Sequence, residues 1–419
     1  MQIRKVKIFN FINFQEATFY LDTHFNVVIG ENQTGKSTLL HAMQVATGAF
    51  FLGLPYVKRR HIQEDEIRFE INQETKQSHY FTPTIVEAVG SINGNGEFTW
   101  RRVISDYGKS ASLRNSDIGQ IKQIAENYSK SLTTIRNRPM LPVIVFFGVK
   151  QLGGNVTRKK RIKKNRVIIK DGYYNALGAQ SDEATFTQWF YYYQENLKDN
   201  LEFNGTYEAV IEAIETAIPY LKNVSFDNFR LELVADCEIE GQPTKRLPHS
   251  LMSDGVKRML GIVADIAYRC IVLNGFRGSE AVKETKGVVM IDELDMHLHP
   301  NWQRVVVANL KKAFPRIQFV VTTHSPFIVQ SLESDELINL DFIMDVPPNE
   351  MKIDEVATDV MGVDSPYAVQ NDQRYDKAKK ILKLIESGES TSLIQDEIDE
   401  IPDPGLRAFL ELNKLSKGK

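Results

Sequence analysis

Four short apolar runs lie far apart along the chain, and each ends at a glycine or a polar turn. They cover residues 25–29, 141–147, 287–291 and 317–322. Continuous apolar runs of this length, bounded by turn residues, are typical of strands that are buried on both faces. Helix-like segments lie between them. The pattern predicts an α/β fold whose buried strands end in loops, as in an open parallel sheet.

A β-rich pattern occupies the N-terminal part of the chain. Residues 3–20 and 65–106 resemble antiparallel strands, and Ser91–Gly96 is typical of a hairpin turn. Two more strands are predicted within Val224–Glu240, and the chain becomes strand-like again after Gln330. Apolar residues at helical spacing predict helices over 39–48, 206–222, 256–270, 371–388 and 391–416.

The composition narrows the class of protein. Of the 419 residues, 42% are hydrophobic and 25% are charged, which is ordinary for a globular protein. The net charge of −3 gives no general attraction for nucleic acid, so any such site must be a local patch. Two cysteines, Cys237 and Cys270, exclude a disulfide framework and favour a reducing compartment. We find no signal peptide and no run of about 18 apolar residues, so we expect a cytoplasmic protein with no membrane partner.

The first apolar run leads into a loop that matches G-x-x-x-x-G-K-[ST] at every fixed position. Backbone N–H groups in such a loop surround phosphates, and the following helix directs its positive end at the same anion. Lys36 can reach the β- and γ-phosphates, and Ser37 offers a hydroxyl to Mg²⁺. The candidate nucleotide-binding residues here are Gly30, Asn32, Gln33, Thr34, Gly35, Lys36, Ser37 and Thr38.

Three further features follow in an order that suits nucleotide hydrolysis. Asp292 and Glu293 end a buried strand, where the first would hold Mg²⁺ and the second would polarise the attacking water. His324 ends the next buried strand and could contact the γ-phosphate or that water. Ser253, Asp254 and Gly255 open a strong helix, with Ser253 at the N-cap position and anion-binding N–H groups nearby.

Residues 1–335, which contain these four motifs in this order, resemble the ABC-type ATPase heads of transporters, SMC proteins, RecF and overcoming-lysogenization-defect (OLD) enzymes. The resemblance implies a P-loop ATPase head, with a mixed sheet, an antiparallel β lobe, an inserted helical lobe and a helical C-terminal tail. It implies that Ser253–Gly255 of one subunit completes the nucleotide site of another, and that Asp295 couples the two sites. The cofactors would be ATP and Mg²⁺. Gln33 departs from the family, in which a glycine usually occupies that position.

A closer resemblance is to stand-alone bacterial ATPases of the Septu and retron anti-phage systems, the PtuA-like group. It rests on Pro142–Gly148 with the basic turn after it, Asp171–Leu177, Phe186–Phe190, the Ser-Asp-Gly turn and Met361–Pro366. The resemblance implies a homodimer or higher even oligomer that senses or regulates, paired with a separate HNH-type nuclease. The chain has no Asp-x-Asp of the kind a Toprim nuclease needs, so we predict no intrinsic nuclease activity. The alternatives are a RecF/SMC-like DNA-repair ATPase and a transporter subunit.

Several residues allow two interpretations. The basic run at 158–166 could bind DNA or RNA, or could be a solvated loop. Gln151 could contact the metal as a Q-loop glutamine. His297 and His299 could be metal ligands, but a loop before a proline-started helix is the simpler interpretation. The aromatic residues around 186–193 suit core packing better than base stacking.

These interpretations divide the chain into four expected domains. They are an ATPase lobe with the phosphate loop (1–140), an inserted helical and basic lobe (141–250), a second ATPase lobe with the remaining motifs (251–345) and a C-terminal helical tail (346–419).

Overall fold

The computed structural model describes residues 1–108, 117–132, 138–149, 168–178, 190, 205–238, 241, 243–341, 346–365, 377–385, 391–401 and 404–417. They separate into two compact units, Met1–Ile353 and Asp354–Lys419.

The first unit contains a five-stranded sheet in the order β14-β3-β13-β12-β8, with every neighbouring pair parallel. The strands are β3 (Phe25–Ile29), β8 (Val143–Phe147), β12 (Gly287–Ile291), β13 (Ile317–Thr322) and β14 (Leu337–Asn339). All residues of the first four are buried, because strands that are apolar on both faces need cover on both sides. The four predicted strands are confirmed. Since β8 is an edge strand of this sheet, it belongs to the core and not to the inserted lobe in which we had placed it.

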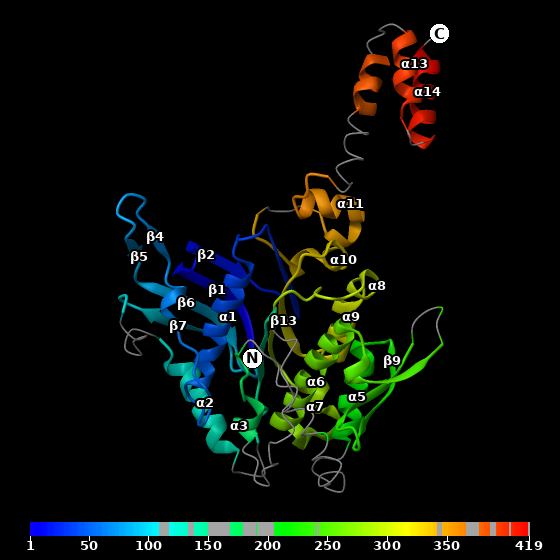
Figure 1. The fold of residues 1–419 in the computed structure, drawn as a ribbon. Helices are drawn as coiled ribbons and strands as arrows, with labels where there is room; N and C mark the ends of the chain where they lie inside the picture. Colours follow the sequence, from blue (N-terminus) through cyan, green and yellow to red (C-terminus); the bar gives the residue numbers. More distant parts are fainter. Residues whose placement is uncertain are drawn as a thin grey trace. The chain divides into compact units, whose positions relative to one another are not determined.

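An antiparallel lobe pairs the N-terminal strands with a later hairpin in the order β2-β1-β6-β7. Its strands are β1 (Gln2–Phe11), β2 (Phe14–Tyr20), β6 (Thr84–Ser91) and β7 (Phe98–Ile104), and a separate hairpin is formed by β4 (Phe69–Ile71) and β5 (Ser78–Tyr80). Buried and half-buried residues alternate along β6, as on a sheet with one face against a core. The predicted antiparallel lobe is confirmed, and Figure 1 shows its strands beside α1.

Two buried helices pack against the sheets. α1 (Lys36–Phe51) contacts both the antiparallel strands and the parallel strands β12 and β13. α6 (Asp254–Asn274) packs on α5 (Thr206–Ala217), α3 (Ile168–Gly172) and β8. Among the described residues, Asp254–Glu284 alone is long and apolar enough to span a membrane, yet 83% of its apolar window is buried inside the protein. It therefore has the burial of a core helix.

The shorter helices of the first unit are α2 (Gly119–Ser131), α7 (Ala281–Glu284), α8 (Pro300–Gln303), α9 (Val306–Ala313) and α10 (Pro326–Val329), with 3₁₀ turns at 64–66, 249–251, 275–280, 334–336 and 348–350.

The described part of the segment between β8 and α6 includes the two strands predicted around Val224–Glu240. It contains a second antiparallel sheet in the order β11-β10-β9, formed by β9 (Leu221–Asp227), β10 (Glu232–Cys237) and β11 (Lys245–Pro248). Phe190, the described member of the aromatic stretch, is fully buried and stacks on Phe226 with ring centroids 5.6 Å apart. For this residue the prediction of core packing is confirmed.

The turn after α3 holds two core elements together. The Tyr173 hydroxyl donates to the backbone oxygen of Pro142 at 2.7 Å, next to β8. On the α6 side, Arg269 Nη1 donates to the backbone oxygen of Gly172 at 2.9 Å. A Cβ on Gly172 would come within 2.3 Å of the Leu273 side chain. The Asp171–Leu177 motif thus has a packing role in this chain.

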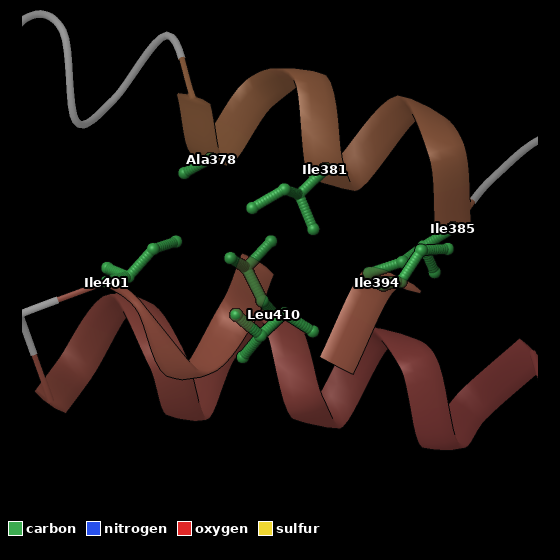
Figure 2. Close-up of a cluster of buried hydrophobic side chains, with 7 residues drawn as sticks. Ala378, Ile381, Ile385, Ile394, Ile401 and Leu410 are labelled. Carbon is green, nitrogen blue, oxygen red and sulfur yellow. The ribbon is translucent and has the colours of Figure 1, made fainter. Parts of the chain in front are cut away.

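The second unit is helical. After a π-helical turn (Val356–Val360), it contains a helix over 377–385, α13 (Thr391–Asp399) and α14 (Pro404–Lys417). The predicted helix over 391–416 is therefore two helices, which separate where Pro402 and Pro404 interrupt the sequence. Figure 2 shows side chains of the three helices directed toward one another. Their buried cluster consists of Ala378, Ile381, Ile385, Ile394, Ile398, Ile401 and Leu410.

Candidate nucleotide-binding site

Three of the predicted motifs lie at one edge of the parallel sheet. The phosphate loop follows β3, Asp292 and Glu293 follow β12, and His324 lies two residues after β13. The register pairs Ile291 of β12 with Val321 of β13, so these strands end at the same level. Because the carboxyl ends of parallel strands form the crevice where ligands bind in open α/β sheets, the topology brings together residues that are up to about 290 positions apart.

The backbone of the phosphate loop is unusual at three positions. Gly30 and Gly35 have φ of 155° and 113°, and a Cβ on Gly35 would come within 2.4 Å of the Phe14 ring. Gln33, at a position where the resemblance noted above implies a glycine, has φ of 72°. A left-handed backbone costs a residue with a Cβ about 1 kcal/mol. The chain keeps the loop conformation without that glycine.

Lys36 begins α1 and points across the mouth of the loop. Its Nζ donates to the backbone oxygens of Gly30 and Glu31 at 2.7 and 2.8 Å. Burial lowers the pKa of Lys36, while the negative charges of Asp341, Asp292 and Glu293 raise it. The ammonium group therefore lies among carbonyl and carboxylate oxygens at the position where a phosphate chain would replace them as acceptors.

Two hydroxyls beside Lys36 have different partners. Ser37 Oγ lies 3.5 Å from Asp292 Oδ1, which also accepts a hydrogen bond of 2.7 Å from Thr322 Oγ1. Thr38 Oγ1 instead donates to Asn13 Oδ1 at 2.9 Å. The described residues contain no group of three His, Cys, Asp or Glu residues that could hold a metal. A hydroxyl beside one carboxylate fits Mg²⁺, which binds few protein oxygens and keeps water and phosphate ligands; Ser37 and Asp292 supply such a pair.

Glu293 has a strained backbone at the end of β12. Its φ is 51°, the left-handed region that non-glycine residues rarely adopt. Its N–H donates to Thr322 Oγ1 at 2.8 Å, and its backbone oxygen accepts from Arg258 Nη1. Such strain persists only where surrounding contacts enforce it, and it concentrates at functional sites. Glu293 directly follows Asp292, and its negative charge acts on Lys36.

Arg258 connects α6 to the same loop. It is 4% exposed, and its guanidinium donates to the backbone oxygens of Asp292, at 2.7 Å, and Glu293. Burial lowers its pKa, while the charges of Asp295, Glu293 and Asp292 raise it. We call residues 292–295, which follow β12, the acidic loop. An arginine with these acceptors fixes the backbone of the acidic loop relative to α6.

The Ser-Asp-Gly turn lies at the start of α6 as predicted. Ser253 occupies the N-cap position, but its side chain makes no capping hydrogen bond. Ser253 and Asp254 are exposed, whereas Gly255 is buried. A Cβ on Gly255 would come within 2.1 Å of the backbone oxygen of His297. The turn is therefore packed against the loop after β12 through its glycine, while its serine faces outward.

Asp295 joins that loop to the turn containing His324. Its Oδ1 accepts from Thr323 Oγ1 at 2.6 Å and from the His324 N–H at 3.2 Å. The His324 side chain is exposed. His299 is the N-cap of α8, where its Nδ1 accepts from the Asn301 N–H at 3.3 Å and Pro300 follows. The interpretation as a loop before a proline-started helix is confirmed for His299.

Sequence reasoning missed three residues of this site. Asn13, in the β1–β2 turn, bonds to the phosphate loop, and Arg258 holds the acidic loop. Asp341, just after β14, accepts from the Glu31 N–H through Oδ2 at 2.7 Å. For Asp341 a signal existed, since an acid after a strand-like run repeats the pattern of Asp292. Gln151 and the basic run at 158–166 lie outside the described residues.

Comparisons with known proteins identify the family of the chain. A family model described as an AAA domain matches residues 5–222, and a second, described as "AAA domain, putative AbiEii toxin, Type IV TA system", matches residues 225–330. A retron Vc95 probable ATPase of Vibrio cholerae is 23% identical over 393 residues, which covers 80% of this chain and 73% of that protein. A Septu protein PtuA of Bacillus thuringiensis is 32% identical over 146 residues, 30% of this chain and 36% of that protein.

Among solved structures, the SMC head domain of Thermotoga maritima matches with a TM-score of 0.44 and 14% identity. The match covers 81% of this chain and 94% of that structure.

Proposed function

The chain belongs to the AAA-domain family of ATPases, and from that premise we propose that two copies form each nucleotide site together. Lys36 of one copy would bind the phosphates from the loop side. Ser253 of the second copy would approach from the other side. ATP would then bridge the two chains, so that binding favours a homodimer or a higher even oligomer.

The residues would divide the work as follows. The loop amides and Lys36 bind the phosphates, and Ser37 and Asp292 hold Mg²⁺, which neutralises phosphate charge when it is bound. Glu293 accepts a proton from the attacking water, positioned by its strained backbone and the Thr322 hydroxyl. His324, exposed at the end of β13, contacts the γ-phosphate side.

One observation carries the proposal of a shared site. The Ser253 hydroxyl stands at the exposed N-terminus of a helix of 21 residues, and it makes no capping bond. A helix N-terminus with a free hydroxyl suits an anionic group. Leu251, two residues earlier, is 68% exposed, which suits burial against a second chain. Arg258, on the helix that this turn opens, connects it to the acidic loop of its own copy.

Mixing two inactive variants tests the shared site. Lys36→Ala disables the phosphate loop of a chain, and Ser253→Arg blocks its Ser-Asp-Gly turn. In a mixed dimer, the intact loop of one chain meets the intact serine of the other. We expect each variant alone to have almost no turnover and an equal mixture to recover about a quarter of the wild-type rate. No recovery in a mixture that forms mixed dimers would contradict the shared site.

We further propose that this ATPase regulates a separate nuclease of the HNH type in an anti-phage system. The local identity to PtuA and the longer match to a retron ATPase support this role. The basic run at 158–166 would bind DNA or RNA, and the helices of the second unit would contact the nuclease. The two unpaired cysteines support a cytoplasmic location.

Phage challenge of cells that carry the gene with its native neighbours tests this role. We expect protection that is lost with Lys36→Ala and with deletion of an adjacent nuclease gene. Protection that needs no neighbour would contradict the regulatory role. Sensitivity to DNA damage without any phage phenotype would instead favour the repair ATPase alternative. Replacing the basic residues of 158–166 should weaken nucleic-acid binding and its salt dependence.

A further inference from the structure

The turn between β1 and β2 makes two contacts with the phosphate loop that the proposed function does not use. Asn13 Nδ2 donates to the backbone oxygen of Gln33 at 3.1 Å. Thr38 Oγ1 donates to Asn13 Oδ1 at 2.9 Å. A single side chain thus joins the outer part of the loop to the first turn of α1. These two positions bracket the segment that would surround the phosphates.

Gln33 explains why the loop needs such a contact. It has φ of 72°, a backbone conformation that favours glycine. The Gln33 side chain is exposed, so core packing does not enforce that conformation. The hydrogen bond from Asn13 acts directly on the peptide that follows the strained residue, and it can favour the left-handed geometry over its alternatives.

The turn that carries Asn13 is itself held by the antiparallel lobe. The Ile12 N–H donates to the backbone oxygen of Glu66 at 2.8 Å. Phe14 packs edge-to-face on Phe19, with ring centroids 5.8 Å apart, and lies against the α-carbon of Gly35. The backbone of Asn13 is therefore held in place, and its side-chain amide can hold Gln33 of the phosphate loop in one position.

We propose that Asn13 is a positioning residue for ATP hydrolysis, which holds the phosphate loop in its binding conformation before the nucleotide arrives. The hydrogen bond from the Asn13 amide stabilises the left-handed backbone of Gln33, which a glycine at this position would adopt without strain. Asn13 acts through Gln33 and Thr38, without contact to the reacting atoms. Its loss should therefore change nucleotide affinity and KM more than kcat.

Equilibrium binding of ADP and of a non-hydrolysable ATP analogue, together with steady-state kinetics, tests this role. We expect Asn13→Ala to raise Kd and KM about five- to tenfold, with kcat within about twofold, because two hydrogen bonds are lost. Thr38→Val should shift Kd in the same direction, and Thr38→Ser should not. The double variant should be less than additive, since both changes break one linkage. Asn72→Ala is the matched control, because the Asn72 side chain accepts from the Glu74 and Thr75 N–H groups of its own hairpin turn.

A glycine at position 33 separates positioning from general stability. In the Asn13→Ala background, Gln33→Gly should restore most of the lost affinity, because glycine adopts the left-handed backbone without strain. Unchanged Kd in Asn13→Ala would overturn the proposal. So would a failure of Gln33→Gly to restore affinity, or a loss that follows the melting temperature in every variant. The affinity for ADP is a property of the loop of one chain, so this measurement is independent of whether two copies share a site for ATP.

Discussion

The phosphate loop and the Ser-Asp-Gly turn are both glycine-containing turns at helix N-termini, yet their surroundings differ. The loop has contacts within its own chain on each side, from Asn13, Asp341 and the Lys36 ammonium. At the turn, Gly255 is fixed against His297 while the Ser253 hydroxyl has no capping partner. The difference shows that the loop is held by partners within its own chain, while the turn presents an exposed hydroxyl that makes no capping bond.

The two regions are connected through backbone atoms of the acidic loop. Arg258 extends from the helix that Ser253 opens and binds the backbone oxygens of Asp292 and Glu293. A displacement of the turn would therefore move Asp292 and Glu293, the residues proposed to hold Mg²⁺ and to polarise water. If a second chain contacts Ser253 as proposed, that contact would reach the acidic loop through Arg258 and so influence hydrolysis.

The largest effect is expected on kcat when Glu293, just after β12, is replaced. Glu293→Gln keeps the shape and removes the proton acceptor, so we expect kcat to fall about a thousandfold while ATP binding is retained. Rapid-quench measurement of a single turnover checks the chemical step, and size-exclusion chromatography with ATP should show a longer-lived dimer. Asp396→Asn, an exposed acid of the tail helix α13, is the control. A variant that turns over at the wild-type rate would remove Glu293 from the mechanism.

The Ser-Asp-Gly turn should respond to a single methyl group. A Cβ on Gly255 would come 2.1 Å from the backbone oxygen of His297, whereas a Cβ on Gly261 of the same helix would meet nothing within 4 Å. We expect Gly255→Ala to lower the free energy of unfolding by about 2 kcal/mol and Gly261→Ala to raise it by up to about 1 kcal/mol. Urea unfolding measures both, and equal effects would mean that the turn is not packed as described.

The sequence predicts the core sheet because burial on both faces leaves an unmistakable pattern. All residues of β3, β8, β12 and β13 are buried, and most of them are apolar, so the four strands can be found as apolar runs. It does not predict which sheet a run joins. β8 was grouped with the inserted lobe, because only its pairing with β12 reveals its place. Pairing between distant strands leaves no local pattern.

For the site, motifs give the residues whose chemistry is tied to a fixed spacing. Lys36, Asp292 and Glu293 were found in this way and meet at one sheet edge. Asn13 and Arg258 were missed because each acts on backbone atoms of a distant segment. A bond to a carbonyl requires no particular residue type at the other end, so no sequence motif records it. The strain at Gln33 was visible only as a departure from the family.

A smaller effect is expected on ATP affinity at high pH, where Lys36 loses its proton. Burial lowers the pKa of Lys36 below its ordinary 10.5, although neighbouring acids oppose this. ATP affinity should therefore be complete at neutral pH and should fall before the pH reaches that value. Stability has the opposite sign: the folded chain releases this proton more readily than the unfolded chain, so stability rises with pH between the two pKa values. Lys36→Arg should bind less tightly at neutral pH but keep its affinity at high pH. A parallel alkaline loss in both variants would assign it to another group.

The smallest effect is expected on ATP affinity when Asp341, the acid bonded to the phosphate loop, loses its charge. Asp341 accepts from the Glu31 N–H at 2.7 Å and adds a third negative charge near Lys36. Asp341→Asn keeps an oxygen that can accept this bond and removes only the charge, which repels phosphates. We expect ATP to bind about threefold to fivefold more tightly, with a difference that shrinks as salt rises. Asp341→Ala should gain less, because the bond to the loop is also lost. If Asp341→Asn binds ATP more weakly at every salt concentration, the carboxylate supports Lys36 instead of competing for it, and the phosphate loop would then depend on β14 as well as on the β1–β2 turn for its binding geometry.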